Sequence, residues 1–454
     1  MFGFLASRDH ESFDAALRGG RESAATSDTG KAAKILIHGI NFYPELIGVG
    51  KYSGELAFAL AKRGHAVEVV TAPPHYPGWV VEAPFRWWVY HRETIAGVSV
   101  LRCPILAKRC GQGLWRALAP LSFAVFAAPA VIWRILRTRP DVVMCIEPTL
   151  FSAPAAFLAA RLVGARSVLH VQDLEVDAAF EVGHLSGVRI RNLALLLERW
   201  VLRHFDLVVT ISQKMREALV RKGAPADRTT VLRNWVDLDA IRPLPRDAPN
   251  AFRRELGLPD DSFVTLYSGH LGKKQALDVV SEAASLCVNH PRLHFVIVGD
   301  GPMKAGLIAR HSASRNVTFL PLQPVERFND LLNLANLHVL PQAKRTGDLV
   351  FPSKLGAMLA SGRPLVATLE PDSELARLLE GVALLVPPDR PAALAETIIA
   401  ASSQDLGLLT QRGLRLAALL SGKHILPNFE ALLLGAAPAT PSAIESNFDP
   451  VIAG

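Results

Sequence analysis

Residues 264–274 read VTLYSGHLGKK, and residues 275–286 continue as QALDVVSEAASL. An apolar run of strand type breaks at Gly269, and after a short turn an apolar face with the 3.6-residue helical period begins at Leu277. This order of strand, glycine turn and helix is the geometry that directs backbone N–H groups at an anion. A lysine in the turn, such as Lys274, adds a point charge suited to phosphate. An ordinary strand-to-helix turn with solvated lysines has the same pattern, so the rest of the chain must decide between the two.

The chain alternates strand-like and helix-like segments in two successive halves. We expect strands at residues 34–40, 66–71, 98–102, 141–146, 167–171, 206–212 and 229–234, and then at 264–268, 293–300, 316–321, 337–341, 364–369 and 383–387. Continuous Val, Leu and Ile runs of this kind are typical of strands buried on both faces of a parallel sheet. The predicted fold class is α/β, with two Rossmann-like, doubly wound domains facing a central cleft and the ligand at the carboxyl ends of the strands.

A chain of 454 residues exceeds what one hydrophobic core usually spans. We predict a flexible leader at residues 1–32, a first domain at 33–235, a proline-rich linker at 236–262 and a second domain at 263–420. Residues 421–454 are predicted to be a C-terminal segment that ends in a disordered Ala/Pro-rich tail.

Half of the residues are hydrophobic and a fifth are charged, which indicates a globular and not a disordered chain. The net charge of +7 suits phosphate-bearing substrates, nucleic acid or an anionic membrane, and does not choose among them. The four cysteines form no CxxC motif, so we expect buried thiols in a reducing compartment.

Two segments suggest contact with a membrane. Residues 117–133 carry no charge over a length at the short end of a membrane span. We predict a buried or interfacial helix there, with a full span as the alternative. The preceding segment, residues 73–93, is either an irregular loop or a rim that faces a membrane or an acceptor. The residues that would make the rim are Trp79, Trp87, Trp88, Arg86 and Arg92.

In the first half, Gly48 and Gly50 lie between a strand and a helix that Ser53 is predicted to cap, and they permit a ligand to approach the backbone closely. A phosphate-binding P-loop would need glycine where Glu45 stands. The dinucleotide fingerprint GxGxxG also fails, because the spacing here is GxGxxxG. These mismatches disfavour ATP hydrolysis and NAD binding.

In the second half, Gly299 belongs to a GDGP turn that follows a strong strand. Farther on, Asp348 precedes a helix expected to start near Ser353, whose free N–H groups would suit a phosphate. Lys354 would lie in the first turn of that helix, where an anionic ligand would explain a cation. A surface lysine is the alternative.

The sequence DxD at residues 237–239 binds metal in some sugar-transferring enzymes. Here it falls in the predicted linker, so we interpret it as a turn and expect no metal site.

With these motifs in place, the chain resembles the retaining glycosyltransferases of family 4, which have the GT-B fold, and within them the colanic acid biosynthesis (WcaI-like) group. The resemblance runs from about residue 34 to residue 402. The stretches that carry it are GVGKYSGELAFALAKRGHAVEVVTAPPHYP, PTLFSAPAAFLAARLVGARSVLHVQDLEVDAAF, YSGHLGKKQALDVV and FPSKLGAMLASGRPLVAT.

The resemblance implies that a sugar moves from a nucleotide-sugar to an acceptor with retention at the anomeric carbon, without metal or another cofactor. Matched by position, Gly269 and Lys274 belong to the donor site, and Gly48 and Gly50 form the glycine loop of the first domain. From the turn and helix start described above, we add Gly299, Ser353 and Lys354 as candidate binding residues for the nucleotide-sugar. His170, Gln172 and Asp173 match a segment that contacts the sugar or acceptor, and Asp348 matches a residue that contacts the donor sugar. We count His170, Asp173 and Asp348 as the candidate catalytic residues.

There are two departures from the family pattern. His270 stands where many members have arginine, and Gly356 stands where most have the second glutamate of a Glu-x7-Glu pair. These departures motivate one alternative, an inactive nucleotide-sugar-binding scaffold. A two-domain nucleotide-sugar epimerase, an enzyme of similar fold, is the second alternative. We expect a lipid-diphosphate-linked saccharide acceptor, a peripheral position on the cytoplasmic face of the cell membrane, and no nucleic acid partner.

Overall fold

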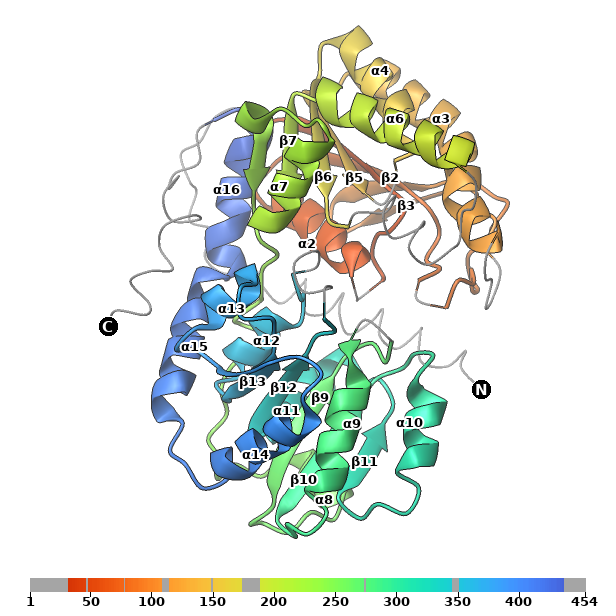
Figure 1. Cartoon of the computed structure of the whole chain (residues 1–454). Helices are drawn as coiled ribbons and strands as arrows, with labels where there is room; N and C mark the ends of the chain where they lie inside the picture. The colour runs from red at the N-terminus through yellow and green to blue at the C-terminus, as the bar shows by residue number, and fades with distance from the viewer. Residues whose placement is uncertain are drawn as a thin grey trace. The chain divides into compact units, whose positions relative to one another are not determined.

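The structure is a computed structural model (Figure 1). It describes residues 32–45, 48–76, 78–107, 114–147, 150–173, 188–272, 275–344 and 351–436. The chain forms two compact units, of which the first combines residues 1–233 with 426–439 and the second contains residues 234–425.

In the described residues, the first unit has an eight-stranded sheet with the order β3-β4-β2-β1-β5-β6-β7-β8. Its strands are β1 (Lys34–Gly39), β2 (Ala66–Thr71), β3 (His91–Ile95), β4 (Val98–Arg102), β5 (Val142–Glu147), β6 (Arg166–Val171), β7 (Leu207–Thr210) and β8 (Thr229–Val231). All pairs are parallel except that between β3 and β4. The helices are α2 (Val49–Lys62), α3 (Leu114–Thr138), α4 (Ala153–Val163), α6 (Val188–His204) and α7 (Gln213–Lys222), with the 3-10 turn η1 (Ala226–Arg228).

Helices pack on both faces of this sheet. His38 pairs with Cys145 and His170 with Ile146, the next residue along β5, so the two histidines point to opposite faces. His38 stacks on Phe123 of α3 with a centroid distance of 5.5 Å. His170 packs on Phe429 of α16 (Gly422–Leu434) with a centroid distance of 5.1 Å.

The second unit has a parallel sheet whose strand order, in the described residues, is β11-β10-β9-β12-β13-β14. The strands are β9 (Phe263–Ser268), β10 (Leu293–Val298), β11 (Val317–Leu320), β12 (Leu337–Pro341), β13 (Leu365–Thr368) and β14 (Leu384–Val386). The helices are α8 (Ala251–Glu255), α9 (Leu277–Leu286), α10 (Lys304–Arg310), α11 (Val325–Leu334), α12 (Leu355–Ala360), α13 (Glu374–Leu379), α14 (Pro391–Ala401) and α15 (Gly407–Leu419).

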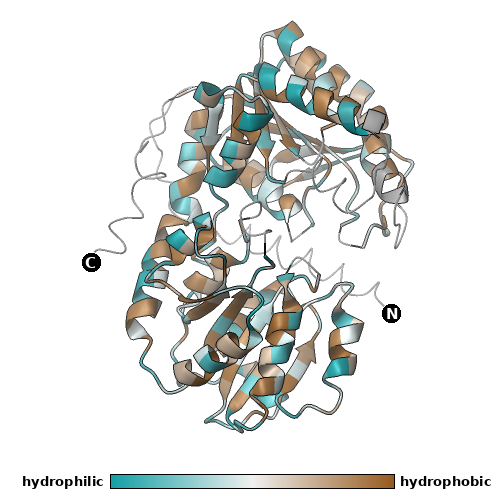
Figure 2. Cartoon of the chain, viewed as in Figure 1, coloured by the Kyte–Doolittle hydropathy of each residue, from teal (hydrophilic) through white to brown (hydrophobic). Residues whose placement is uncertain are grey.

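This sheet is buried on both faces, as its apolar runs predict. Phe295 and Ile297 of β10 belong to one hydrophobic cluster, and the alternate residues Val296 and Val298 belong to another. Figure 2 shows the strands of this unit as hydrophobic. The predicted α/β architecture of two parallel-sheet domains is therefore confirmed.

Two local predictions differ from the structure, and a third segment forms a helix that was not predicted from the sequence. Helix α2 begins at Val49, and Ser53 lies inside it, where its hydroxyl donates to the Val49 carbonyl at 2.8 Å instead of capping the helix. The aromatic segment before residue 98 contains a strand, β3, that pairs antiparallel with β4. Residues 422–434 form helix α16, within which the chain passes from the second unit back to the first.

Candidate functional site

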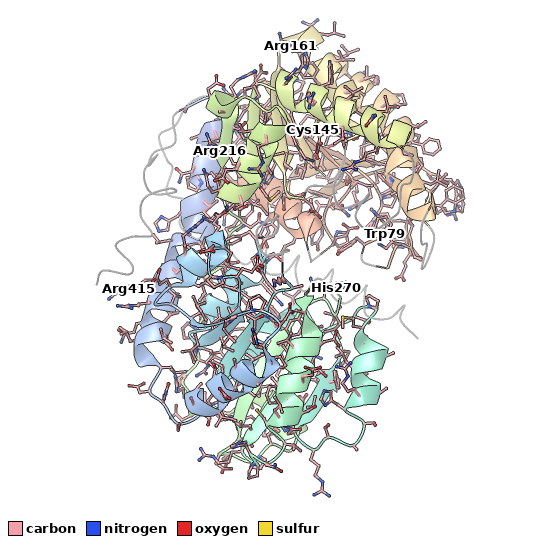
Figure 3. All side chains as sticks on the ribbon, viewed as in Figure 1. Trp79, Cys145, Arg161, Arg216, His270 and Arg415 are labelled. Carbon is pink, nitrogen blue, oxygen red and sulfur yellow. The ribbon has the colours of Figure 1, made fainter. Side chains whose placement is uncertain are left out.

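The second unit brings its candidate site residues to the carboxyl end of β9. The strand order changes direction between β9 and β12, and ligands of doubly wound sheets bind outside the strand ends at such a point. The chain leaves β9 through Gly269, which has a φ of 144° that favours glycine. His270 follows it, and Figure 3 shows this residue at the same end of the sheet. The hydroxyl of the buried Tyr267 donates to the His270 carbonyl at 2.7 Å and holds the turn.

A neighbouring loop packs directly on this turn through two glycines. A Cβ atom on Gly299 would lie 1.9 Å from the Gly269 carbonyl oxygen, and one on Gly301 would lie 2.4 Å from the Leu271 oxygen. The Leu271 N–H donates to the Asp300 carbonyl at 2.8 Å. Gly299, predicted as a donor-site residue, therefore has a packing role that places the Gly269 turn.

Lys354 is the notable charged group at this turn. Its Nζ atom is buried, has no hydrogen-bond partner among the described residues, and lies 3.9 Å from the ring centroid of Tyr267. It is also 3.6 Å from the position that a Cβ of Gly269 would occupy. Burial lowers the pKa of Lys354 to about 7. An anionic group beside Gly269 would supply the counter-charge that this ammonium lacks.

The backbone at Lys354 differs from the prediction. Helix α12 has six residues, and Lys354 is its N-cap residue and not a member of the first turn. Ser353 precedes it and is exposed. The case for ligand binding by Lys354 therefore comes from the position of its side chain, over Tyr267 and beside Gly269. It does not come from a place in the first turn of a helix.

The departure at Gly356 has a steric explanation within the second unit. A Cβ atom on Gly356 would lie 3.1 Å from Cβ of Val236. Val236 is held in place because its N–H donates to the Leu420 carbonyl at 2.9 Å and its carbonyl accepts from Gly422 N–H at 3.0 Å. A glutamate at position 356 would require Val236 to move by a few tenths of an ångström.

Another histidine is buried behind Lys354. His338 of β12 shares a hydrogen bond of 3.0 Å between its Nε2 and the Ser361 hydroxyl. Burial, together with the nearby charges of Arg363 and Lys354, lowers the pKa of His338 to about 3. The ring is therefore neutral at physiological pH and adds no charge to the site.

In the first unit, the glycine loop rests on a buried carboxylate. Oε1 of Glu45 accepts from the N–H groups of His75 and Tyr76 at 2.9 Å each, and Oε2 accepts from the Asn41 amide at 2.8 Å. A Cβ atom on Gly50 would lie 2.7 Å from Cβ of Glu45. Glu45 thus joins the loops after β1 and β2 and requires glycine at position 50.

The two glycines of this loop have different places. Gly48 is the exposed N-cap residue of α2, with a φ of 62°, and it remains available to a ligand. Gly50 is buried in the first turn of α2, not ahead of the helix as predicted. In the sequence, Glu45 only excludes a P-loop, and nothing in the local pattern signals its structural role.

The predicted acceptor segment follows β6. The His170 ring is 1% exposed, packs on Phe429, and burial lowers its pKa to about 3. These surroundings indicate a packing role for His170. Gln172 is mostly buried, whereas Asp173 is exposed. Of the three, Asp173 is the one whose side chain is accessible to a ligand.

Two predicted site residues, Lys274 and Asp348, lie outside the described residues. The described part of the chain contains no group of three His, Cys, Asp or Glu side chains placed to hold a metal ion. The DxD segment forms a turn, in which Oδ1 of Asp237 accepts from the N–H groups of Asp239 and Ala240 at 2.8 and 3.2 Å.

Comparisons with known proteins agree with this architecture. Residues 48–235 match the glycosyl transferase 4-like domain, and residues 262–404 match glycosyl transferases group 1. The chain therefore belongs to the family 4 glycosyltransferases with the GT-B fold.

Within that family it is 40% identical over 374 residues to the putative colanic acid biosynthesis glycosyl transferase WcaI of Escherichia coli K12. The aligned region covers 80% of this chain and 91% of the relative. Among solved structures, sucrose-phosphate synthase of Thermosynechococcus elongatus has a TM-score of 0.66 at 18% identity, covering 88% of this chain and 98% of its own. HepE of Anabaena, in complex with UDP and glucose, has a TM-score of 0.64 at 18% identity, covering 89% of this chain and 100% of its own.

Proposed function

We propose that this glycosyltransferase moves a hexose from a nucleotide-sugar to a lipid-diphosphate-linked saccharide in the synthesis of an exopolysaccharide. The observation that carries the donor assignment is the buried Lys354 Nζ beside Gly269, which has no hydrogen-bond partner within the part of the chain that the structure describes. The name of the Escherichia coli relative supports a role in a colanic-acid-like polysaccharide. The UDP and glucose bound to HepE support a nucleotide-sugar donor.

In this proposal the donor diphosphate binds at the end of β9, next to Gly269 and the Lys354 ammonium. Cleavage of the bond between sugar and diphosphate leaves positive charge on the sugar ring and additional negative charge on the leaving diphosphate. The Lys354 ammonium, already positioned by Tyr267, stabilises that developing negative charge without reorganisation. The reaction would retain the anomeric configuration and need no metal ion, and the enzyme would act at the cytoplasmic face of the membrane.

The experiment incubates the purified chain with detergent and a lipid-diphosphate sugar acceptor, against UDP-, GDP- and ADP-sugars, with and without EDTA. Nucleotide release and the anomeric configuration of the product are measured for the wild type, Lys354→Met and a control, Lys423→Met. Lys423 is exposed and pairs with Asp239. We expect acceptor-dependent release from one donor, unaffected by EDTA and reduced about 100-fold in Lys354→Met only.

Each other outcome contradicts part of the proposal. Binding of a nucleotide-sugar without release from any donor would identify a scaffold, and conversion of a donor to an isomer without acceptor would identify an epimerase. Equal activity of Lys354→Met and the wild type would remove Lys354 from the donor site.

A further inference from the structure

We propose that the outer surface of helices α3, α4 and α6 docks on the face of a lipid bilayer that contains anionic lipids. This surface is here called the α3–α4–α6 face. The proposal names the part of the protein that would contact the membrane in the proposed function, and it depends on that function only for its biological purpose. Its exposed apolar residues are Leu121, Val125, Phe126, Trp133 and Leu136 of α3, Leu158 and Leu162 of α4, and Leu193 and Leu196 of α6.

Helix α3 is apolar on the side that faces away from the protein. Leu121, Val125 and Trp133 are spaced by multiples of four residues and are 38%, 69% and 45% exposed. Pro129 completes the spacing and is also exposed. A surface helix of a globular domain normally places polar residues on its outer side. An apolar outer stripe of this length therefore indicates a binding surface.

The neighbouring helices extend the stripe into a face. Leu162 of α4 and Leu193 of α6 are 77% and 69% exposed, more than most leucines that the structure describes. Phe157 of α4 contacts Trp200 of α6 at a centroid distance of 5.4 Å, so these two helices pack side by side. Helix α3 packs against α4, and Figure 1 shows the three helices in one layer.

A second group of exposed aromatic residues joins this face. The Tyr90 hydroxyl donates to the Phe126 carbonyl of α3 at 2.7 Å, which fixes the segment before β3 against the helix. Trp87 and Trp88, 43% and 55% exposed, lie in this segment. Arg86 lies over the Trp88 ring at 5.9 Å. Tryptophan with arginine is the combination that favours the headgroup region of a bilayer.

The charges around the face select its partner. The exposed arginines in the described part of the three helices are Arg137, Arg161, Arg191, Arg199 and Arg203. Figure 3 shows Arg161 at the outer end of the unit, on α4. The only carboxylate within the sequence of these helices is Glu198, which is buried and accepts from the Lys222 ammonium at 2.7 Å. Asp206, which follows α6, pairs with Arg161 at 3.5 Å, and both side chains remain partly exposed. A second copy of the chain would bring these arginines near one another, whereas anionic lipid headgroups neutralise them.

The contacts of α3 favour a helix that lies on the bilayer over one that crosses it. The part Leu118–Thr138 is long and apolar enough to span a membrane by length and composition. Its other side, however, is fixed to the sheet, since Phe123 stacks on His38 and Arg134 pairs with Glu68 at 2.7 Å. Spanning would break this pair and expose the apolar faces of β1 and β2. Shallow burial of the outer stripe in the interface needs none of these changes.

The test is co-sedimentation of the full chain with vesicles. One set of vesicles contains phosphatidylethanolamine and phosphatidylglycerol, and the other contains phosphatidylcholine alone. The variant Val125→Glu/Leu162→Glu/Leu193→Glu changes three exposed positions of the face. The matched control, Leu286→Glu/Val288→Glu/Leu408→Glu, changes positions of the second unit that are 54%, 54% and 58% exposed. Circular dichroism and the melting temperature check that both variants fold.

We expect the wild type and the control to bind the anionic vesicles at least 10-fold more strongly than the face variant. Binding of the wild type should weaken in high salt, and it should be weaker to the phosphatidylcholine vesicles than to the anionic ones. Equal binding by the face variant and the wild type would overturn the proposal. Absence of wild-type binding, with a wild-type dimer that the face variant dissociates, would show that a second copy covers the face. The vesicle assay needs no turnover, so its result is independent of the proposed transfer reaction. Transfer is measured in parallel with a water-soluble acceptor, so failure of either proposal can be recognised separately.

Discussion

At the scale of single residues, the proposed contact of Lys354 with the donor should make donor binding depend on pH. The pKa of its ammonium is lowered to about 7 in the free protein, and a bound diphosphate would raise it again. Binding therefore takes up a proton above pH 7. We predict that the dissociation constant of the nucleotide-sugar, measured by calorimetry, rises by up to about tenfold per pH unit between pH 7 and pH 9. Lys354→Met should bind weakly at every pH, and a flat wild-type profile would refute the assignment.

The same lysine should lower the stability of the protein. Its pKa is 10.5 in the unfolded chain and about 7 in the folded one, so the unfolded state holds an extra proton between these values and stability rises with pH across that window. The cost of burying the ammonium is complete below pH 7. Lys354→Met should therefore raise the free energy of unfolding by a few kcal/mol at pH 6.5, on the order of 1.4 kcal/mol per pKa unit. Urea unfolding at pH 6.5 and 9.5 should show the gain shrinking at the higher pH.

The variant Gly356→Glu tests whether the glutamate that most family members have at this position can be restored. Because a side chain there meets Val236, we predict that Gly356→Glu lowers the melting temperature by several degrees and does not improve donor affinity. The control is Gly306→Glu, because a Cβ atom on Gly306 of α10 would meet nothing within 4 Å. Equal melting temperatures for the two variants would show that Val236 moves aside.

At the scale of elements, Arg102 connects the loops at one end of the first sheet. It is fully buried in β4, pairs with Glu93 of β3, and donates to the Tyr43 carbonyl at 2.8 Å and to the Ala72 carbonyl at 3.3 Å. Breaking a buried ion pair by removing one partner typically costs about 3–5 kcal/mol.

Arg102→Met is therefore predicted to lower the free energy of unfolding by about that amount in urea titrations, because the Glu93 carboxylate and two carbonyl groups lose their donor. Arg92→Met, at an exposed position on β3, is the control and should stay within about 0.5 kcal/mol of the wild type. Adding Glu93→Gln to the Arg102 variant should recover part of the loss. An Arg102→Met protein as stable as the wild type would mean that these loops hold together by other contacts.

At the scale of the whole molecule, the C-terminal end of the described chain completes the first unit. Phe429 covers His170, and Oε1 of Glu430 accepts from Nε2 of His65 at 2.8 Å. A chain that ends after residue 425 lacks both side chains. We predict that this truncation yields insoluble protein or lowers the melting temperature by more than 10 °C, consistent with the ~3–5 kcal/mol lost when a buried Phe alone is deleted.

The control truncation ends after Ala436, beyond the last described helix. It keeps the Phe429 and Glu430 contacts and should melt with the full chain. A stable, monomeric product of the shorter truncation would show that the first unit folds without α16, contrary to the structure.

Local sequence was sufficient for the alternating strands, because a parallel sheet buried on both faces requires continuous apolar runs that are readable one at a time. Strands β2 and β4 agree with the predicted bounds residue for residue. The turn glycines Gly269 and Gly299 and the family could also be predicted from the sequence, since the order of motifs is a property of the chain itself.

Other features depended on contacts between distant parts of the chain. Strand β3 was missed because only its pairing with β4 makes an exposed, polar segment a strand. The start of α2 and the need for Gly50 depend on Glu45 beneath the loop. Lys354 is unusual only because its ammonium lies against Tyr267 and beside Gly269. The apolar segment of α3 becomes a candidate binding surface only because the sheet buries one side of the helix and leaves another apolar side exposed. Burial and electrostatic environment are set by neighbours far apart in sequence, so the tertiary structure decided them.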